Sequence, residues 1–150
     1  MSSANIGKYN ESGHELMIVG RANKKDVDYV NKNYPGVHMT GFVESVVPYY
    51  EKARIAIVPE LVGGGFKLKI AEAVQYSKPI VAIKGSVTDR SMISGKHYIE
   101  ADTFDDLIIK SLELMKNPGL QADLVNNARL LFRNRYDISY ATKVVNSILD

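Results

Sequence analysis

The sequence predicts a single α/β domain built on a parallel sheet with helices on both faces. Short uncharged runs rich in β-branched residues alternate with longer stretches of helical pattern, which is typical of a parallel sheet covered by helices. The chain has 150 residues, of which 45% are hydrophobic. A chain of this length supports one hydrophobic core and has no room for a second independent core.

Five short apolar runs are predicted to be the strands. They are too short for helices, and most consist of residues suited to burial on both faces of a parallel sheet. The third run ends at Pro59, which cannot donate a hydrogen bond to a neighbouring strand. In chain order the predicted strands are residues 16–20, 37–40, 55–58, 80–83 and a short strand within 97–101.

The helices between these strands are recognised mainly by the residues at their ends. Pro35 and Gly36 end the first helix, and Ser45 is expected to cap the second by accepting a hydrogen bond from a free N–H. Thr103 with Asp106 three residues later resembles a capping box. In chain order the predicted helices are residues 25–34, 45–52, 68–74, 103–116, 120–133 and 138–149.

Composition and charge exclude several classes of function. Nineteen basic and seventeen acidic residues give a formal net charge of +2, which is too small to indicate nucleic-acid binding. Cysteine is absent and the three histidines are scattered, so no disulfide and no metal site are expected. No apolar run approaches the ~20 residues of a membrane span. We therefore expect a soluble, cytoplasmic protein without a nucleic-acid partner.

One segment near the end of the chain has two interpretations. Arg129, Arg133 and Arg135 flank an apolar run at 130–132, as in helices that lie on a membrane surface. The same pattern arises when a helix packs on the core and its arginines extend into solvent. Peripheral association with the inner face of the membrane is thus an alternative that the sequence leaves open.

A glycine-rich segment at 63–65 separates the third strand from the helix that follows. Backbone without side chains can approach a ligand closely, and a helix start offers unpaired N–H groups and the positive end of its dipole to a phosphate. Lys67 and Lys69 lie in the first turn, where a cation opposes the dipole unless an anion binds. Because open α/β sheets bind ligands at the carboxyl ends of their strands, the segment predicts an anion site. A flexible turn with solvent-exposed lysines is the alternative.

Glu72 lies about a turn and a half along the same helix. A carboxylate can accept hydrogen bonds from two vicinal hydroxyls, as a ribose presents them, next to a phosphate held at the helix start. The small apolar neighbours Ala71, Ala73 and Val74 indicate that this helix packs closely on the sheet. The alternative is a solvated glutamate, which is the usual fate of this residue type.

These residues resemble a known family. The run GGGFKLKIAEA at 63–73, followed by KPIVA at 78–82, is similar to the nucleotide-sugar loop and helix of the family 4 glycosyltransferases of the GT-B fold. The Gly-Phe-Val run at 41–43 and the strand that ends at Pro59 follow the same order of landmarks. The resemblance covers nearly all of the chain from Leu16 onward.

In that family this half of the protein is the C-terminal, Rossmann-like domain, which holds the nucleotide-sugar donor. The resemblance implies that the backbone at 63–66 and the lysines face the diphosphate, that Glu72 holds the ribose, and that Phe42 and Val43 lie beside the base. It also implies metal-independent transfer, because the helix dipole and cationic side chains neutralise the leaving diphosphate. The implied donor-binding residues are Phe42, Val43, Gly63, Gly64, Gly65, Phe66, Lys67, Lys69 and Glu72.

The chain departs from the family pattern in two places. The first glutamate of the family's E-x7-E motif falls at Gly64, so one contact to the donor sugar is missing. The fifteen residues before Leu16 are too few for the domain's usual opening strand and its diphosphate-binding Arg/Lys pair. The N-terminal domain, which in the family binds the acceptor and carries the catalytic histidine, is also expected to be missing from this chain, so no catalytic residue is predicted.

The sequence leaves three functions open. The first is the donor-binding half of a retaining glycosyltransferase that uses a UDP-, GDP- or similar nucleotide sugar in glycan or polysaccharide synthesis. It needs an N-terminal acceptor-binding domain or a partner subunit, so the isolated chain is expected to be inactive. The second is a non-catalytic nucleotide or nucleotide-sugar-binding module. The third is an interaction domain whose glycines are structural.

Overall fold

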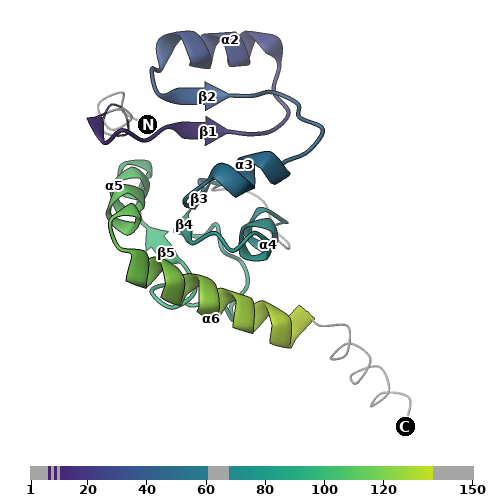
Figure 1. Cartoon of the computed structure of the whole chain (residues 1–150), viewed down its shortest axis with the longest axis vertical. Helices are drawn as coiled ribbons and strands as arrows, with labels where there is room; N and C mark the ends of the chain where they lie inside the picture. Colours follow the sequence, from purple (N-terminus) through teal and green to yellow (C-terminus); the bar gives the residue numbers. More distant parts are fainter. Residues whose placement is uncertain (1–6, 8, 10, 61–67, 137–150) are drawn as a thin grey trace.

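The computed structural model describes residues 7, 9, 11–60 and 68–136, and Figure 1 shows how their helices and strands are arranged. The strand pairings among these residues are all parallel, which confirms the predicted α/β class. Two predicted features lie outside the described residues: the glycine-rich segment through Lys67, and the last helix at 138–149.

The first unit of the fold consists of β1 (Leu16–Ile18), α2 (Lys24–Asn33) and β2 (Val37–Met39). The two strands pair with Leu16 opposite Val37, and α2 packs against β2. Asn23 caps α2, since its side-chain oxygen accepts the Asp26 N–H at 2.9 Å. In Figure 1 this unit forms one end of the molecule.

Helix α3 (Val47–Lys52) begins one residue later than a Ser45 cap predicts. The N-cap residue is Val46, which makes no side-chain cap bond, so the helix starts one residue later than predicted. The predicted bond itself is present, because the Ser45 hydroxyl accepts the Val47 N–H at 3.2 Å. Pro48 fixes the start of the helix, because a proline in the first turn has no N–H that needs a partner.

The second sheet has the strand order β3-β4-β5. Its strands are β3 (Ala56–Val58), β4 (Ile80–Ile83) and β5 (Ile99–Ala101). All four residues of β4 are buried, as expected for an uncharged strand covered on both faces. Its side chains alternate between two clusters of the core, with Ile80 and Ala82 in one and Val81 in the other.

Three helices cover the two faces of this sheet. They are α4 (Leu68–Gln75), α5 (Phe104–Met115) and α6 (Pro118–Tyr136). The cluster around Ile80 contains Ala73 of α4 and Ala128 of α6. The cluster around Val81 contains Leu107 of α5. The prediction of helices on both faces is therefore confirmed for this sheet.

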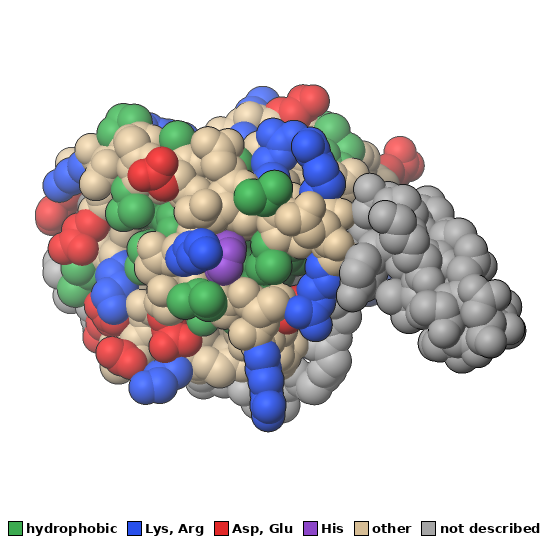
Figure 2. All heavy atoms as spheres, turned by 90° about the horizontal axis from the view of Figure 1, so that it is seen from below, with side chains coloured by type: hydrophobic (Ala, Val, Ile, Leu, Met, Phe, Trp, Pro, Cys, Tyr) green, Lys and Arg blue, Asp and Glu red, His purple; other side chains and the backbone are tan. Residues whose placement is uncertain are grey.

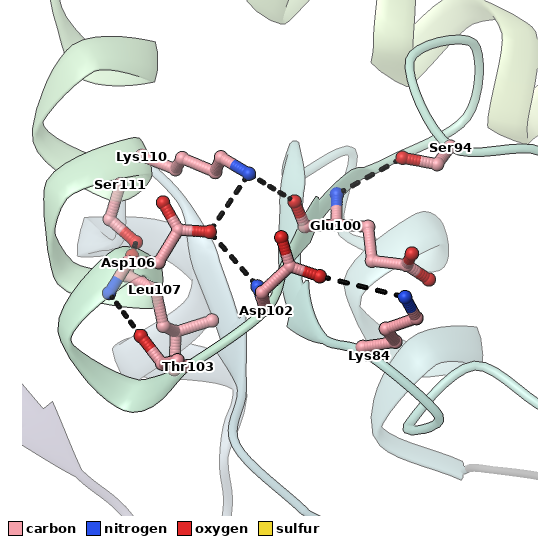
Figure 3. A network of polar contacts seen from close by, with 9 residues as sticks. All are labelled: Lys84, Ser94, Glu100, Asp102, Thr103, Asp106, Leu107, Lys110 and Ser111. Atoms are coloured by element: carbon pink, nitrogen blue, oxygen red, sulfur yellow. Dashed lines mark hydrogen bonds and ion pairs between the residues drawn. The ribbon is translucent and has the colours of Figure 1, made fainter.

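A polar network connects β5 to α5 (Figure 3). Thr103 Oγ1 accepts the Asp106 N–H at 3.1 Å, which confirms the predicted cap. The Asp106 carboxylate accepts the N–H of Asp102 at 2.9 Å instead of that of Thr103, so the capping box is displaced by one residue. Lys110 forms a 2.8 Å ion pair with Asp106 and donates to the Glu100 carbonyl. These contacts fix the direction in which α5 leaves the sheet.

The strands form two sheets instead of one continuous sheet. Among the described residues, β1 pairs with β2 alone and β3 pairs with β4 alone. The apolar run at 16–20 predicts burial on both faces, but Met17 is 45% and Ile18 is 38% exposed. That prediction is wrong: successive residues of a strand point to opposite faces, so the exposure of both Met17 and Ile18 shows that neither face of β1 is fully covered.

Candidate functional site

The described members of the predicted site follow two neighbouring strands in the sequence. Phe42 and Val43 come after β2, and Lys69 and Glu72 lie on α4, which follows β3. Ligands of open α/β sheets bind beyond the carboxyl ends of the strands, so these positions agree with the expected location. The other five predicted residues, Gly63, Gly64, Gly65, Phe66 and Lys67, lie outside the described residues.

Lys69 and Glu72 line the same cleft, which has a volume of about 680 Å³. Residues of β1 and β3 form its length, and α3 contributes Tyr50. The structure thus places the lysine and the glutamate on the wall of one cleft. Phe42 and Val43 are not among the residues that line the cleft.

The Glu72 carboxylate has a defined partner. The Tyr50 hydroxyl donates to Glu72 Oε2 at 3.2 Å. The Tyr50 ring stacks on Tyr76, with ring centroids 4.7 Å apart and planes 14° apart. Tyr76 follows Glu72 by four residues, which places both on one side of the helical turn. Stacking holds the Tyr50 ring, and the ring in turn orients the carboxylate.

This environment changes the ionisation of Tyr50. Burial, followed by the neighbouring Glu72 carboxylate, raises the pKa of Tyr50 from its ordinary value of 10 to about 12. The folded protein therefore retains a proton that the unfolded chain loses, and the stabilisation is complete below pH 10 and lost as the pH rises through 12.

We expect the free energy of unfolding to fall between pH 10 and pH 12, and to fall less steeply in Tyr50→Phe than in the parent. Urea titrations at pH 9 and pH 11 measure the difference. Burial and Glu100 also raise the pKa of Tyr98 to about 12, so Tyr98→Phe provides a matched comparison away from the cleft. An identical pH dependence in parent and Tyr50→Phe would show that Tyr50 is not shielded.

Lys69 forms an ion pair with Glu60, which lies just after β3. The Lys69 side chain is 60% exposed, and an exposed pair of this kind contributes little to stability. The Glu60 carbonyl accepts a hydrogen bond from the buried Ser86 hydroxyl, which connects the loops that follow β3 and β4. The ammonium group is thus held near the carboxyl end of β3 by a carboxylate that another anion can replace.

Phe42 occupies a different part of the surface. Its ring is 67% exposed, and the Arg21 guanidinium lies 5.6 Å from the ring centroid. Arg21 follows β1 and Phe42 follows β2, so the contact joins the carboxyl ends of the paired strands. An exposed ring beneath a cation presents a flat surface on which an aromatic base can stack.

Sequence reasoning missed four residues at these positions: Tyr50 and Tyr76 beside Glu72, Glu60 beside Lys69, and Arg21 beside Phe42. Tyr76 could have been predicted from the sequence, because it follows Glu72 by four residues and residues four apart are neighbours on a helix. Glu60 and Lys69 are separated by a loop, and Tyr50 and Glu72 by 22 residues. No local pattern predicts these two contacts.

The described part of the chain carries few other signs of a ligand. No three His, Asp or Glu side chains are grouped there as a metal site requires, and no helix in it is long and apolar enough to cross a membrane. On the face seen in Figure 2, basic, acidic and apolar side chains are interspersed.

Leu131 and Phe132 of α6 pack against the core, whereas Leu130 is 58% exposed. Leu131 and Phe132 therefore have a structural role in the core.

The family described as "Glycosyl transferases group 1" matches residues 4–117. The chain belongs to the group 1 glycosyltransferases. No curated protein matches the chain by sequence.

Solved structures share the fold of this group 1 glycosyltransferase chain at low sequence identity. The C-terminal domain of the group 1 family protein LpcC from Francisella tularensis has a TM-score of 0.70 and 17% identity, covering 91% of this chain and 77% of that one. TarM of S. aureus has a TM-score of 0.76 and 20% identity, covering 96% and 30%. Anabaena HepE, solved in complex with UDP, has a TM-score of 0.72 and 16% identity, covering 99% and 53%.

These comparisons confirm the predicted Rossmann-like, GT-B half-domain fold. The chain spans less than a third of TarM and about half of HepE.

Proposed function

We propose that the chain is the donor-binding half of a retaining glycosyltransferase that takes a UDP-, GDP- or similar nucleotide sugar and acts in glycan or polysaccharide synthesis. One observation carries the proposal: the Glu72 carboxylate lines the cleft three residues from Lys69 and is held by Tyr50. Family membership and the complex of HepE with UDP support a nucleotide sugar as the ligand.

In this proposal the two charged residues of α4 bind adjacent parts of the donor. Residues three apart on a helix lie on the same face, about 4.5 Å apart along the helix axis. This separation suits one residue that binds a ribose and another that binds the adjacent diphosphate. The Glu72 carboxylate accepts hydrogen bonds from the two ribose hydroxyls. The Lys69 ammonium leaves its ion pair with Glu60 and binds a phosphate oxygen instead. The backbone at 63–66 and Lys67 face the diphosphate, and Phe42 and Val43 lie beside the base.

In this proposal the chain stabilises the leaving group of the transfer, which is the nucleoside diphosphate. As the bond to the sugar breaks, negative charge develops on the nucleoside diphosphate, and cations or helix N–H groups placed there lower the barrier. Lys69 supplies such a charge, and the proposal needs no metal ion. The acceptor and the catalytic groups come from an N-terminal domain or a partner subunit that excludes water from the cleft. The enzyme is expected to work in the cytoplasm.

The test is calorimetric titration of the full chain with UDP and with GDP. We expect weak binding, in the high micromolar range or above, because an open half-site buries little of the ligand. Binding should be unchanged by a chelator, and Lys69→Ala should weaken it about five- to tenfold at low salt. The loss should shrink at high salt, where the charge is screened.

Lys32→Ala provides the matched control, because Lys32 is an exposed lysine on α2. It should bind like the parent. No sugar transfer is expected from the purified chain alone, and transfer on adding an acceptor-binding partner separates a half-enzyme from a non-catalytic module. If neither nucleotide binds, or if Lys69→Ala and Lys32→Ala behave alike, the assignment fails.

A further inference from the structure

Lys69 connects two carboxylates that occupy different places in the candidate site. Glu72 lies three residues further along α4 and lines the cleft together with Lys69. Glu60 forms the ion pair with Lys69, but it is not among the residues that line the cleft. The lysine therefore lies between a carboxylate inside the cleft and a carboxylate outside it.

The two carboxylates are anchored to different elements. Tyr50 of α3 donates a hydrogen bond to Glu72, on the side where β1 and β3 border the cleft. Glu60 is anchored toward β4, which pairs with the other edge of β3. The hydroxyl of the buried Ser86, three residues after β4, donates to the Glu60 carbonyl. Glu72 thus lies on the cleft side of Lys69, and the backbone of Glu60 is held on the β4 side.

A nucleotide sugar has three parts in a matching order. Its diphosphate joins the ribose at one end to the donor sugar at the other. With the ribose at Glu72 and a phosphate oxygen at Lys69, as proposed above, the remaining end of the diphosphate is directed toward Glu60. A hexose in that position presents vicinal hydroxyls, which are hydrogen-bond donors, to the carboxylate.

The Glu60 carboxylate suits this task. Its side chain is 32% exposed, so a ligand can reach it while Ser86 holds its backbone. An ionised carboxylate has two oxygens and about four acceptor sites, and hydrogen bonds to a charged acceptor are stronger than those to a neutral one. When the Lys69 ammonium turns to a phosphate oxygen, hydroxyls of the sugar can replace it as donors to Glu60.

We propose that Glu60 binds the sugar of the donor: its carboxylate accepts hydrogen bonds from vicinal hydroxyls of the hexose while Lys69 binds the diphosphate. The inference rests on the proposed function and deepens it, because it assigns a sugar-binding residue to the β4 side of the site. It gives one substitution two effects of opposite sign. Loss of the carboxylate should strengthen binding of a nucleotide without a sugar, since Lys69 loses a competing anion, and should weaken binding of a nucleotide sugar.

The test is titration of the full chain and of Glu60→Gln with UDP-glucose and with the methyl ester of UDP, which has the same charge but no sugar ring. Glu60→Gln should bind the methyl ester about two- to threefold more tightly at low salt, because an exposed ion pair is weak. It should bind UDP-glucose about threefold more weakly. The ratio of the two dissociation constants should therefore rise about tenfold. GDP-mannose and the methyl ester of GDP form the corresponding pair for a guanine nucleotide.

A double substitution separates competition for Lys69 from contact with the sugar. In Lys69→Ala, adding Glu60→Gln should no longer strengthen binding of the methyl ester, yet it should still raise the ratio about tenfold. NMR titration reaches the weak affinities of these variants. Glu60→Gln should unfold near the parent's temperature, because Ser86 bonds to a backbone carbonyl that the substitution keeps. Glu113→Gln, at an exposed position of α5, is the matched control and should leave the ratio unchanged.

Two results overturn the proposal. One is a ratio that stays within about twofold of the parent's in Glu60→Gln for both pairs of ligands, which means that the carboxylate only competes for Lys69. The other is an equal rise of the ratio in Glu113→Gln, which means that the effect follows overall charge. In both cases the parent still binds the methyl esters, so the proposed donor site stands. A parent that binds no nucleotide at all overturns the proposed function and this inference together.

Discussion

Leu107→Ala is expected to lower the free energy of unfolding by about 2–5 kcal/mol, because truncating a buried leucine loses apolar contacts and leaves a cavity. Leu107 is 0% exposed and packs with Val81, Ala101, Leu114 and Leu124 between α5, α6 and the β3-β4-β5 sheet. Urea denaturation followed by circular dichroism measures the change.

Leu130→Ala is the matched control, since it makes the same chemical change at a side chain of α6 that is 58% exposed. Its effect should stay within about 0.5 kcal/mol. Equal losses in the two variants would contradict the position of α5 on the sheet, because only a covered side chain leaves a cavity when it is truncated.

Glu72→Gln is expected to weaken UDP binding about tenfold or more, because a hydrogen bond to a charged group contributes about 1.5–3 kcal/mol. The loss should be smaller for 2′-deoxy-UDP, which lacks one of the two hydroxyls that Glu72 is proposed to accept. Calorimetric titration of parent and variant with both nucleotides gives the comparison.

Thermal stability should be nearly unchanged in Glu72→Gln, because the glutamine carbonyl can still accept the Tyr50 hydroxyl that the carboxylate accepts at 3.2 Å. Glu113→Gln, at an exposed position of α5, should bind both nucleotides like the parent. Equal losses for UDP and 2′-deoxy-UDP in Glu72→Gln would place the carboxylate away from the ribose.

Local sequence patterns predicted most elements of the fold. The observed strands fall within the predicted runs, because uncharged β-branched segments such as Ile80–Ile83 are stable only where both faces are covered. Thr103 was predicted as a cap from a bond that spans three residues. The division into two sheets was not predictable, because whether β1 and β3 have a common neighbour depends on chain that is distant in sequence.

In the candidate site, too, contacts within one element could be predicted from the sequence and contacts between elements could not. Lys69 and Glu72 could be predicted to lie together, because both belong to one helix and helical geometry fixes their spacing. Their partners Tyr50 and Glu60 come from other elements. Such contacts depend on how α3 and the loop after β3 pack against α4, and no periodicity within either segment encodes that packing.

The exposed helix α2 has a consequence for local unfolding. No residue of α2 is buried, and among the described residues the β1–α2–β2 unit packs on the rest of the chain in a small cluster around Val37, Ile108 and Met115. Regions with few buried apolar contacts open at a lower free energy than the central strands. We therefore expect this unit to unfold locally as a separate foldon while the amides of β4 stay protected from hydrogen exchange. The cleft can thus widen, and exchange what it holds, without global unfolding of the domain.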